Sequence, residues 1–226
     1  LRALGERMDL AVQTAQGLLR TLEAHGMVAQ AGHGKPYELG SAVHLLARRW
    51  LSHQDLAALA RGSALALANA LRESVLVVEL RGARLVALVN ATVEQALNVR
   101  AECETFDRLH AMATGKVLLA FLEATAREKV LGQLGFEEQT EHTITSISAF
   151  REHLAQVQRD GYAESVEESV LGVTAMAVPL RSPSGRVEAA LGMCAPLARW
   201  PAERRSELLS ALRETARDIE ERWREK

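Results

Sequence analysis

The sequence has few cysteines and no marked excess of charge of either sign. Its 226 residues include two cysteines, Cys103 and Cys194, which lie far apart. Two such cysteines cannot build a disulfide framework or a cysteine-rich zinc site, and they fit a reducing compartment, so we expect a cytoplasmic protein. The spacing of Glu102, Cys103 and His110 matches no standard metal site either. The formal net charge is −2, so any contact with DNA must come from a local surface.

Long apolar runs and the common catalytic motifs are also missing. No run approaches the roughly 18 apolar residues of a transmembrane helix, and no signal peptide is visible, so we expect no membrane partner. The motifs Gly-x-Ser-x-Gly, His-Glu-x-x-His and the dinucleotide fingerprint are absent. Gly115-Lys116 resembles the end of a phosphate-binding loop, but His110 and Val117 stand where that loop needs glycine and serine or threonine. We therefore expect neither an enzyme nor a bound cofactor.

Residues 1–40 have the pattern of a DNA-reading module. Apolar residues at positions 1, 4 and 8 predict a short helix, and a second helical pattern runs over 11–25 and is stopped by Gly26. Two segments, 27–30 and 35–40, flank a glycine-rich turn and predict a β-hairpin. Helix, turn, helix and hairpin in this order indicate a winged helix-turn-helix, whose first helix we expect further upstream.

In such a module the second helix enters the major groove, and its early exposed positions reach the bases. The candidates for DNA contact are side chains that can bind bases or phosphates: Gln13, Thr14, Gln16, Arg20 and Lys35. The charges of residues 1–40 sum to zero, however, whereas DNA-binding modules usually carry an excess of cations. A pair of helices used only for packing is the alternative.

Residues 41–72 are predicted to form two helices. The first covers 41–51, with Ser41 as its N-cap, and the second begins at Leu56, after the polar stretch 52–55. We interpret 41–55 as a linker helix and 56–226 as a second, larger domain. The first helix carries an apolar stripe that indicates self-association, with burial against the following domain as the equal alternative: Val43, Leu46, Trp50 and Leu51.

Residues 73–226 alternate between strand and helix patterns. Branched apolar runs predict three strands at 75–80, 84–90 and 95–100, and three later strands at 162–168, 173–181 and 187–194. Helices are predicted between the two groups, over 109–122, 124–134 and 148–160, and a last helix has Pro201 as its first residue. This order gives an α+β fold with an antiparallel sheet flanked by helices. The small residues at 111 and 113–115 leave backbone N–H groups at a helix start free to meet a ligand.

Several motifs together resemble one known family. They are Leu18 to Gly26, Leu109-His110-Ala111, Gly115 to Leu122, Asp160-Gly161-Tyr162-Ala163, Glu167-Glu168, Leu171-Gly172-Val173 and Ala177-Val178-Pro179. Over nearly its whole length the sequence resembles the IclR-type bacterial transcriptional regulators. The resemblance implies a winged helix-turn-helix, a linker helix and a GAF-like domain that binds a small-molecule effector. It also implies a homodimer or a dimer of dimers on near-palindromic, double-stranded operator DNA. Relatives carry an arginine at the position of Gly17, which leaves operator affinity open.

The resemblance also implies which residues line the effector pocket: Leu97, Val99, Ala113, Thr114, Ser165, Val173, Ala175, Gly192 and Cys194. At Ser165, Ala175 and 192–194 this sequence has fewer strong polar groups than its relatives. We therefore expect a more apolar ligand than a short keto acid, such as an aromatic acid. The Thr114 hydroxyl, the nearby backbone N–H groups and Arg100 are the candidate anchors for its carboxylate.

Two other functions stay open. A ligand sensor that has lost DNA binding would fit Gly17 and the neutral first module. An enzyme would need His110, the cysteines or Glu167-Glu168 for acid–base or nucleophilic work. We interpret His110 instead as a hydrogen-bonding residue at the helix entry, and the acidic pair as part of a solvated or structural loop. In a regulator, the effector would shift the balance between two dimer arrangements and so change the spacing of the recognition helices; repression and activation both stay open.

Overall fold

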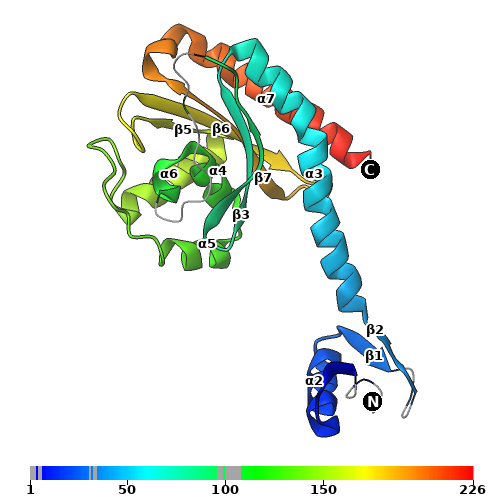
Figure 1. The fold of residues 1–226 in the computed structure, drawn as a ribbon. Coiled ribbons are helices and arrows are strands. Elements are labelled where there is room, and N and C mark those ends of the chain that lie inside the picture. Colours follow the sequence, from blue (N-terminus) through cyan, green and yellow to red (C-terminus); the bar gives the residue numbers. More distant parts are fainter. Residues whose placement is uncertain are drawn as a thin grey trace. The chain divides into compact units, whose positions relative to one another are not determined.

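The computed structural model describes Leu4, residues 7–30, Gly32, residues 35–95, Val99 and residues 108–225, and describes 47–55 by their backbone. Its contacts divide the chain into two compact units, residues 1–54 and 55–226 (Figure 1). The first unit holds helix α2 (Val12–Ala24) and a hairpin, and the second holds a five-stranded sheet. Within these described parts of the chain, no helix is long and apolar enough to cross a membrane.

Helix α2 ends where the sequence predicts. Gly26 has a φ of +67°, which glycine adopts without steric cost. The N–H of Gly26 donates to the carbonyl of Glu23 at 2.9 Å, and the N–H of Met27 donates to that of Leu22 at 2.8 Å. These two bonds form a Schellman cap, which satisfies carbonyls at the helix end. Upstream, Leu4, Arg7 and Met8 are helical, and the other residues of the predicted first helix lie outside the described residues.

The predicted hairpin is confirmed. Strands β1 (Val28–Gln30) and β2 (Tyr37–Leu39) pair antiparallel, with Val28 opposite Leu39. At the base of the hairpin the chain passes very close to itself. A Cβ added to Gly40 would lie 2.0 Å from the carbonyl oxygen of Gly26, so only glycine fits at position 40.

The predicted break at 52–55 is wrong, because helix α3 runs without interruption over Ser41–Leu71. The polar stretch contains neither glycine nor proline, and one polar turn does not end a helix. Of the predicted apolar stripe, Leu46 is exposed in the single chain, as is its neighbour Leu45. The side chains of Trp50 and Leu51 lie outside the described residues.

The second unit is built on an antiparallel sheet, as predicted, which has five of the six predicted strands among the described residues. Its strands, in spatial order, are β4 (Arg84–Ala91), β3 (Ser74–Arg81), β7 (Val187–Pro196), β6 (Val173–Arg181) and β5 (Ala163–Val166). The predicted strand at 95–100 falls mostly outside the described residues. Gln95 and Val99, which are described, belong to no strand.

Helices cover both faces of this sheet (Figure 1). On one face, residues 56–71 of α3 and helix α7 (Arg205–Arg224) pack against side chains such as Val77 and Leu191. On the other face lie α4 (Ala113–Phe121), α5 (Ala124–Leu131) and α6 (Ile147–Asp160), which pack against side chains such as Val78 and Ala190. Because side chains alternate along a strand, each strand contributes to both cores.

The last helix begins later than predicted. Pro201 precedes a short 3₁₀ turn, Ala202–Arg204, and α7 starts only at Arg205. Helix α6 matches the sequence closely, because both its ends carry local signals. The Ser146 hydroxyl accepts a hydrogen bond from the N–H of Ala149, and Gly161 takes a φ of +72°.

Candidate functional site

A row of small side chains crosses the sheet on the face that α4 covers. Ser165 on β5 lies opposite Ala175, Ala175 lies opposite Cys194, and Cys194 lies opposite Ser74. One step along the strands, Ala177 lies opposite Gly192. Because these side chains on four adjacent strands are short, they project little from this end of the sheet face. Three residues of the first row are predicted pocket residues: Ser165, Ala175 and Cys194. Gly192, two residues before Cys194, is a predicted pocket residue as well.

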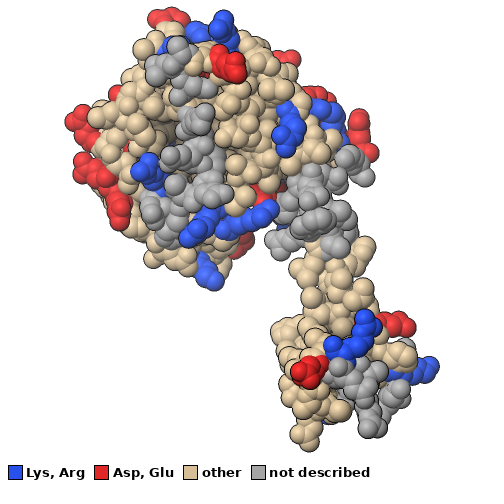
Figure 2. All heavy atoms as spheres, viewed as in Figure 1, with Lys and Arg blue, Asp and Glu red and all other residues tan. Residues whose placement is uncertain are grey.

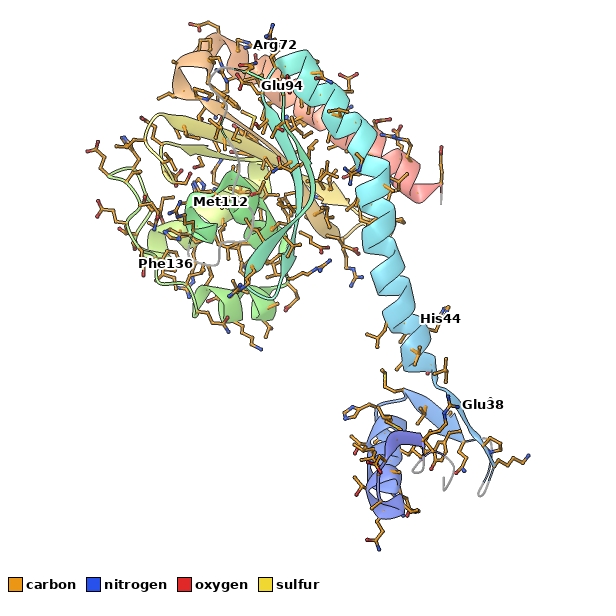
Figure 3. All side chains as sticks on the ribbon, viewed as in Figure 1. Glu38, His44, Arg72, Glu94, Met112 and Phe136 are labelled. Atoms are coloured by element: carbon orange, nitrogen blue, oxygen red, sulfur yellow. The ribbon has the colours of Figure 1, made fainter. Side chains whose placement is uncertain are left out.

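The start of α4 lies directly on this row. A Cβ added to Gly192 would come within 2.6 Å of the Cγ2 atom of Thr114, so the glycine lets the helix approach the strand backbone. Ala113 and Thr114 are both buried. The Thr114 hydroxyl makes no hydrogen bond to any residue that the structure describes. Met112, labelled in Figure 3, marks the point at which the chain enters this helix.

Ser165 and Val99 are held by specific hydrogen bonds. The Ser165 hydroxyl donates to the carbonyl of Ala111 at 2.6 Å, which ties β5 to the turn before α4. The carbonyl of Val99 accepts a hydrogen bond from Ser74 Oγ at 2.7 Å and a contact from Cys194 Sγ at 3.8 Å. The Val99 carbonyl is thereby held at the end of the row of small side chains.

The structure therefore brings most of the predicted pocket residues to one face of the sheet. Ala113, Thr114, Ser165, Ala175, Gly192 and Cys194 meet there, and Val173 lies on β6 two residues before Ala175, on the same side. Leu97 and the candidate anchor Arg100 lie outside the described residues. Cys103 and Glu102 lie outside them as well, and among the described side chains no three could together hold a metal ion.

Lys116 is the residue of this region that sequence reasoning missed. Its side chain has no exposed surface, and its Nζ donates to the carbonyl of Glu164 at 2.9 Å and pairs with the carboxylate of Glu168. Burial lowers the pKa of Lys116, and burial raises the pKa of Glu168. A signal was present: Lys116 interrupts an apolar helical run, and a buried lysine needs an acidic partner such as Glu167-Glu168.

His110 and the acidic pair have structural contacts. The ring of His110 is buried beside Phe136 and Phe150, and its Nε2 lies 3.0 Å from the carbonyl oxygen of Glu137. Burial lowers the pKa of His110, which favours the neutral ring. Phe136 is labelled in Figure 3, on the same side of the sheet as Met112. Glu167 accepts a hydrogen bond from the N–H of Gly172 at 2.8 Å. These contacts agree with the interpretation of His110 as a hydrogen-bonding residue at the helix entry.

The predicted DNA-contacting residues of α2 all lie on its exposed side. Ala15 and Leu19 are the buried residues of this helix, whereas Gln13, Thr14, Gln16 and Arg20 are exposed, and so is Lys35 beside the hairpin. Among the described residues, no side chain or other element lies within 4 Å of a Cβ added to Gly17, so a larger side chain would fit there. Figure 2 shows acidic and basic side chains mixed on this unit.

Comparisons with known proteins agree with this architecture. The domain described as "Bacterial transcriptional regulator IclR C-terminal" matches residues 48–221. The HTH-type transcriptional regulator KdgR of Escherichia coli K12 is 30% identical over 216 residues, which cover 96% of this chain and 82% of KdgR. Both the matching domain and KdgR are described as transcriptional regulators, which agrees with the catalytic motifs that the sequence lacks.

Two solved structures of relatives contain aromatic acids. An IclR homolog from Microbacterium hydrocarbonoxydans, complexed with 4-hydroxybenzoate, is 27% identical with a TM-score of 0.70, and the match covers 98% of this chain and 90% of that one. A double mutant of the Acinetobacter PobR inducer-binding domain, complexed with 3-hydroxybenzoic acid, is 30% identical with a TM-score of 0.64 over 71% of this chain and 95% of that one. The chain belongs to the IclR family of bacterial transcriptional regulators.

Proposed function

We propose that this regulator binds an aromatic carboxylic acid in its second unit and operator DNA through its first. The observation that carries the effector proposal is the low row of small side chains beneath Thr114, whose hydroxyl is not engaged by the described residues. Ala175 is only partly buried, and its side chain is short enough to lie under a flat ring. The aromatic acids bound to two relatives support the same ligand class.

The carboxylate of such a ligand would meet the start of α4. The first N–H groups of a helix have no partner inside it and favour an anion. Helix α4 begins at Ala113. The N–H of Lys116 donates to the carbonyl of Met112, the residue just before the helix. The N–H groups of 113–115 and the Thr114 hydroxyl are therefore the proposed anchors, and Arg100 is a further candidate.

Isothermal titration with 4-hydroxybenzoate tests this proposal. We expect binding by the full chain, and we expect Thr114→Val to weaken it about tenfold, because a hydrogen bond to a charged group is lost without a change of shape. Thr174→Val is the matched control: Thr174 is buried on the opposite face of the sheet, and its hydroxyl has no partner among the described residues. Tight binding of pyruvate or glyoxylate, with none of aromatic acids, would contradict the proposal.

We propose three parts for the whole chain: a winged helix-turn-helix over residues 1–40, a linker over 41–55 and a GAF-like domain over 56–226. Helix α2 would enter the major groove with Gln13, Thr14 and Gln16 toward the bases, while Arg20 and Lys35 contact phosphates. The exposed leucines of α3, Leu45 and Leu46, support a homodimer or a dimer of dimers. The proposed location of the protein is the cytoplasm.

A mobility-shift assay on the DNA upstream of the protein's own gene tests the DNA proposal. We expect a sequence-specific shift that Gln13→Ala weakens and that 4-hydroxybenzoate alters. Gly17→Arg should tighten binding and steepen its salt dependence by about one unit, because it adds a phosphate-contacting cation. A ligand sensor without DNA binding is the second candidate function, since the first unit is neutral. Ligand binding without any shift would favour it.

A further inference from the structure

Two sets of polar contacts, which we call cross-links, join the start of α4 to strand β5 and the loop after it. The Ser165 hydroxyl bonds the carbonyl of Ala111, and Lys116 bonds the carbonyl of Glu164 and pairs with Glu168. Strand β5 is at the edge of the sheet, so its outward carbonyl has no partner strand and is free to accept this bond. The cross-links stand on either side of residues 113–114. A ligand that displaces these residues therefore also pulls on β5.

Glu164 connects this edge strand to the opposite face of the sheet. Its neighbours Ala163 and Ser165 face α4, so its own side chain points the other way, toward α7. The carboxylate accepts two hydrogen bonds from Arg205, the first residue of α7, from Nε at 2.6 Å and from Nη2 at 2.5 Å. Arg205 also donates to the Tyr162 hydroxyl at 2.9 Å. A two-point pair of this kind fixes the orientation of both groups.

Helix α7 in turn shares a core with α3. Leu208 and Leu212 of α7 lie in the same buried cluster as Leu56 and Ala60 of α3. Helix α3 then continues without a break back to Ser41, in the first unit. The contacts that lead from α4 to α3 by this route pass around the edge of the sheet through one residue, Glu164.

We propose that Glu164 transmits a displacement of α4 to α7 and α3, with its carbonyl held by Lys116 and its carboxylate held by Arg205. The proposal rests on the effector control proposed above, although the mechanical link belongs to the second unit alone. Glu164 and Arg205 contact neither of the proposed ligands, so they are positioning residues. Substitutions of Glu164 or Arg205 would alter the coupling free energy between effector and operator and leave both binding sites unchanged.

Hydrogen–deuterium exchange on the full chain tests the link without any ligand. We expect Arg205→Gln to raise the exchange rates of the α4 amides from Lys116 to Ala120 about threefold. Arg204→Gln is the matched control, because Arg204 is the neighbouring residue and pairs with Glu207 in the first turn of α7 instead of with β5. Faster exchange that is confined to the beginning of α7 would overturn the proposal. Equal changes at α4 in both variants would also overturn it.

Operator binding tests the consequence for regulation. The readout is the ratio of operator Kd values with and without saturating 4-hydroxybenzoate, and we expect Arg205→Gln to reduce a wild-type ratio at least fivefold. The Kd for 4-hydroxybenzoate alone should stay within about twofold, and Arg205→Lys should restore part of the ratio because it keeps the charge. A ratio unchanged in Arg205→Gln would overturn the proposed role of Glu164. A wild-type ratio of one would overturn the effector proposal instead, and the exchange experiment alone would then decide whether Glu164 links α4 to α7.

Discussion

At the scale of single residues, the glycine pair at the base of the hairpin makes a sharp prediction. Gly40→Ala should destabilise the first unit by about 3 kcal/mol, since its Cβ would overlap the Gly26 carbonyl oxygen, which is backbone and cannot move aside. Hydrogen exchange of residues 12–40 should rise while that of the sheet in 55–226 stays unchanged. Gly17→Ala is the control. Nothing stands within 4 Å of its added Cβ, so it should stabilise α2 by about 0.5–1 kcal/mol. Similar losses in both variants would contradict this account.

His153 makes the stability of the second unit dependent on pH. Burial and the positive charge of Lys116 lower the pKa of His153 from its usual value of 6.5 to about 4. The unfolded chain therefore takes up the proton first as the pH falls, and stability is lost between about pH 6.5 and 4. Because the ring is only half buried, the loss is about 1–2 kcal/mol. Urea unfolding at pH 7 and pH 4.5 should show this difference, and His153→Gln should reduce it. An equal pH dependence in the variant would contradict the assignment.

At the scale of elements, the pair of Lys116 and Glu168 determines how α4 is held. Lys116→Met should cost about 3 kcal/mol, because it leaves the Glu168 carboxylate buried without its cation. Adding Glu168→Gln should recover most of that loss, since no unpaired charge then remains. Arg151→Met, which breaks an exposed pair with Glu128, should leave the free energy of unfolding nearly unchanged, because water screens that pair. Urea unfolding at pH 7 measures all three. A double variant as unstable as Lys116→Met would show that the lysine acts by packing.

The elements that could be predicted from the sequence are those with local signals. Helix α6 has Ser146 before it and Gly161 after it, and strand β6 was predicted with its observed bounds. The continuity of α3 through the polar stretch 52–55 was not predictable from the sequence, because the continuity of a helix also depends on the cores at its ends.

The candidate site was predictable only in part, for a similar reason. The family motif points to Thr114 and Gly192, but their contact depends on strand register, which brings β7 under α4. Glu164 and Arg205 lie 41 residues apart in the sequence, and neither belongs to a motif. Such a pair becomes visible only when the sheet edge and the start of α7 are placed in space.

At the scale of the whole molecule, the division at residues 54 and 55 separates two physical tasks. Both cores of the sheet are built from residue 56 onward, and so are all the described pocket candidates. A chain of residues 55–226 should therefore fold and bind 4-hydroxybenzoate with a Kd within about threefold of that of the full chain. It should give no mobility shift with operator DNA.

Titration calorimetry and circular dichroism on the shortened chain check this prediction, with Thr114→Val in the same background as the control for the site. A folded 55–226 chain that binds more than tenfold more weakly would mean that residues 1–54 contribute to ligand binding. If affinity is retained, ligand binding needs only the second unit. We then expect the effect of ligand on the operator to travel along α3, which among the described helices is the one with residues in both units.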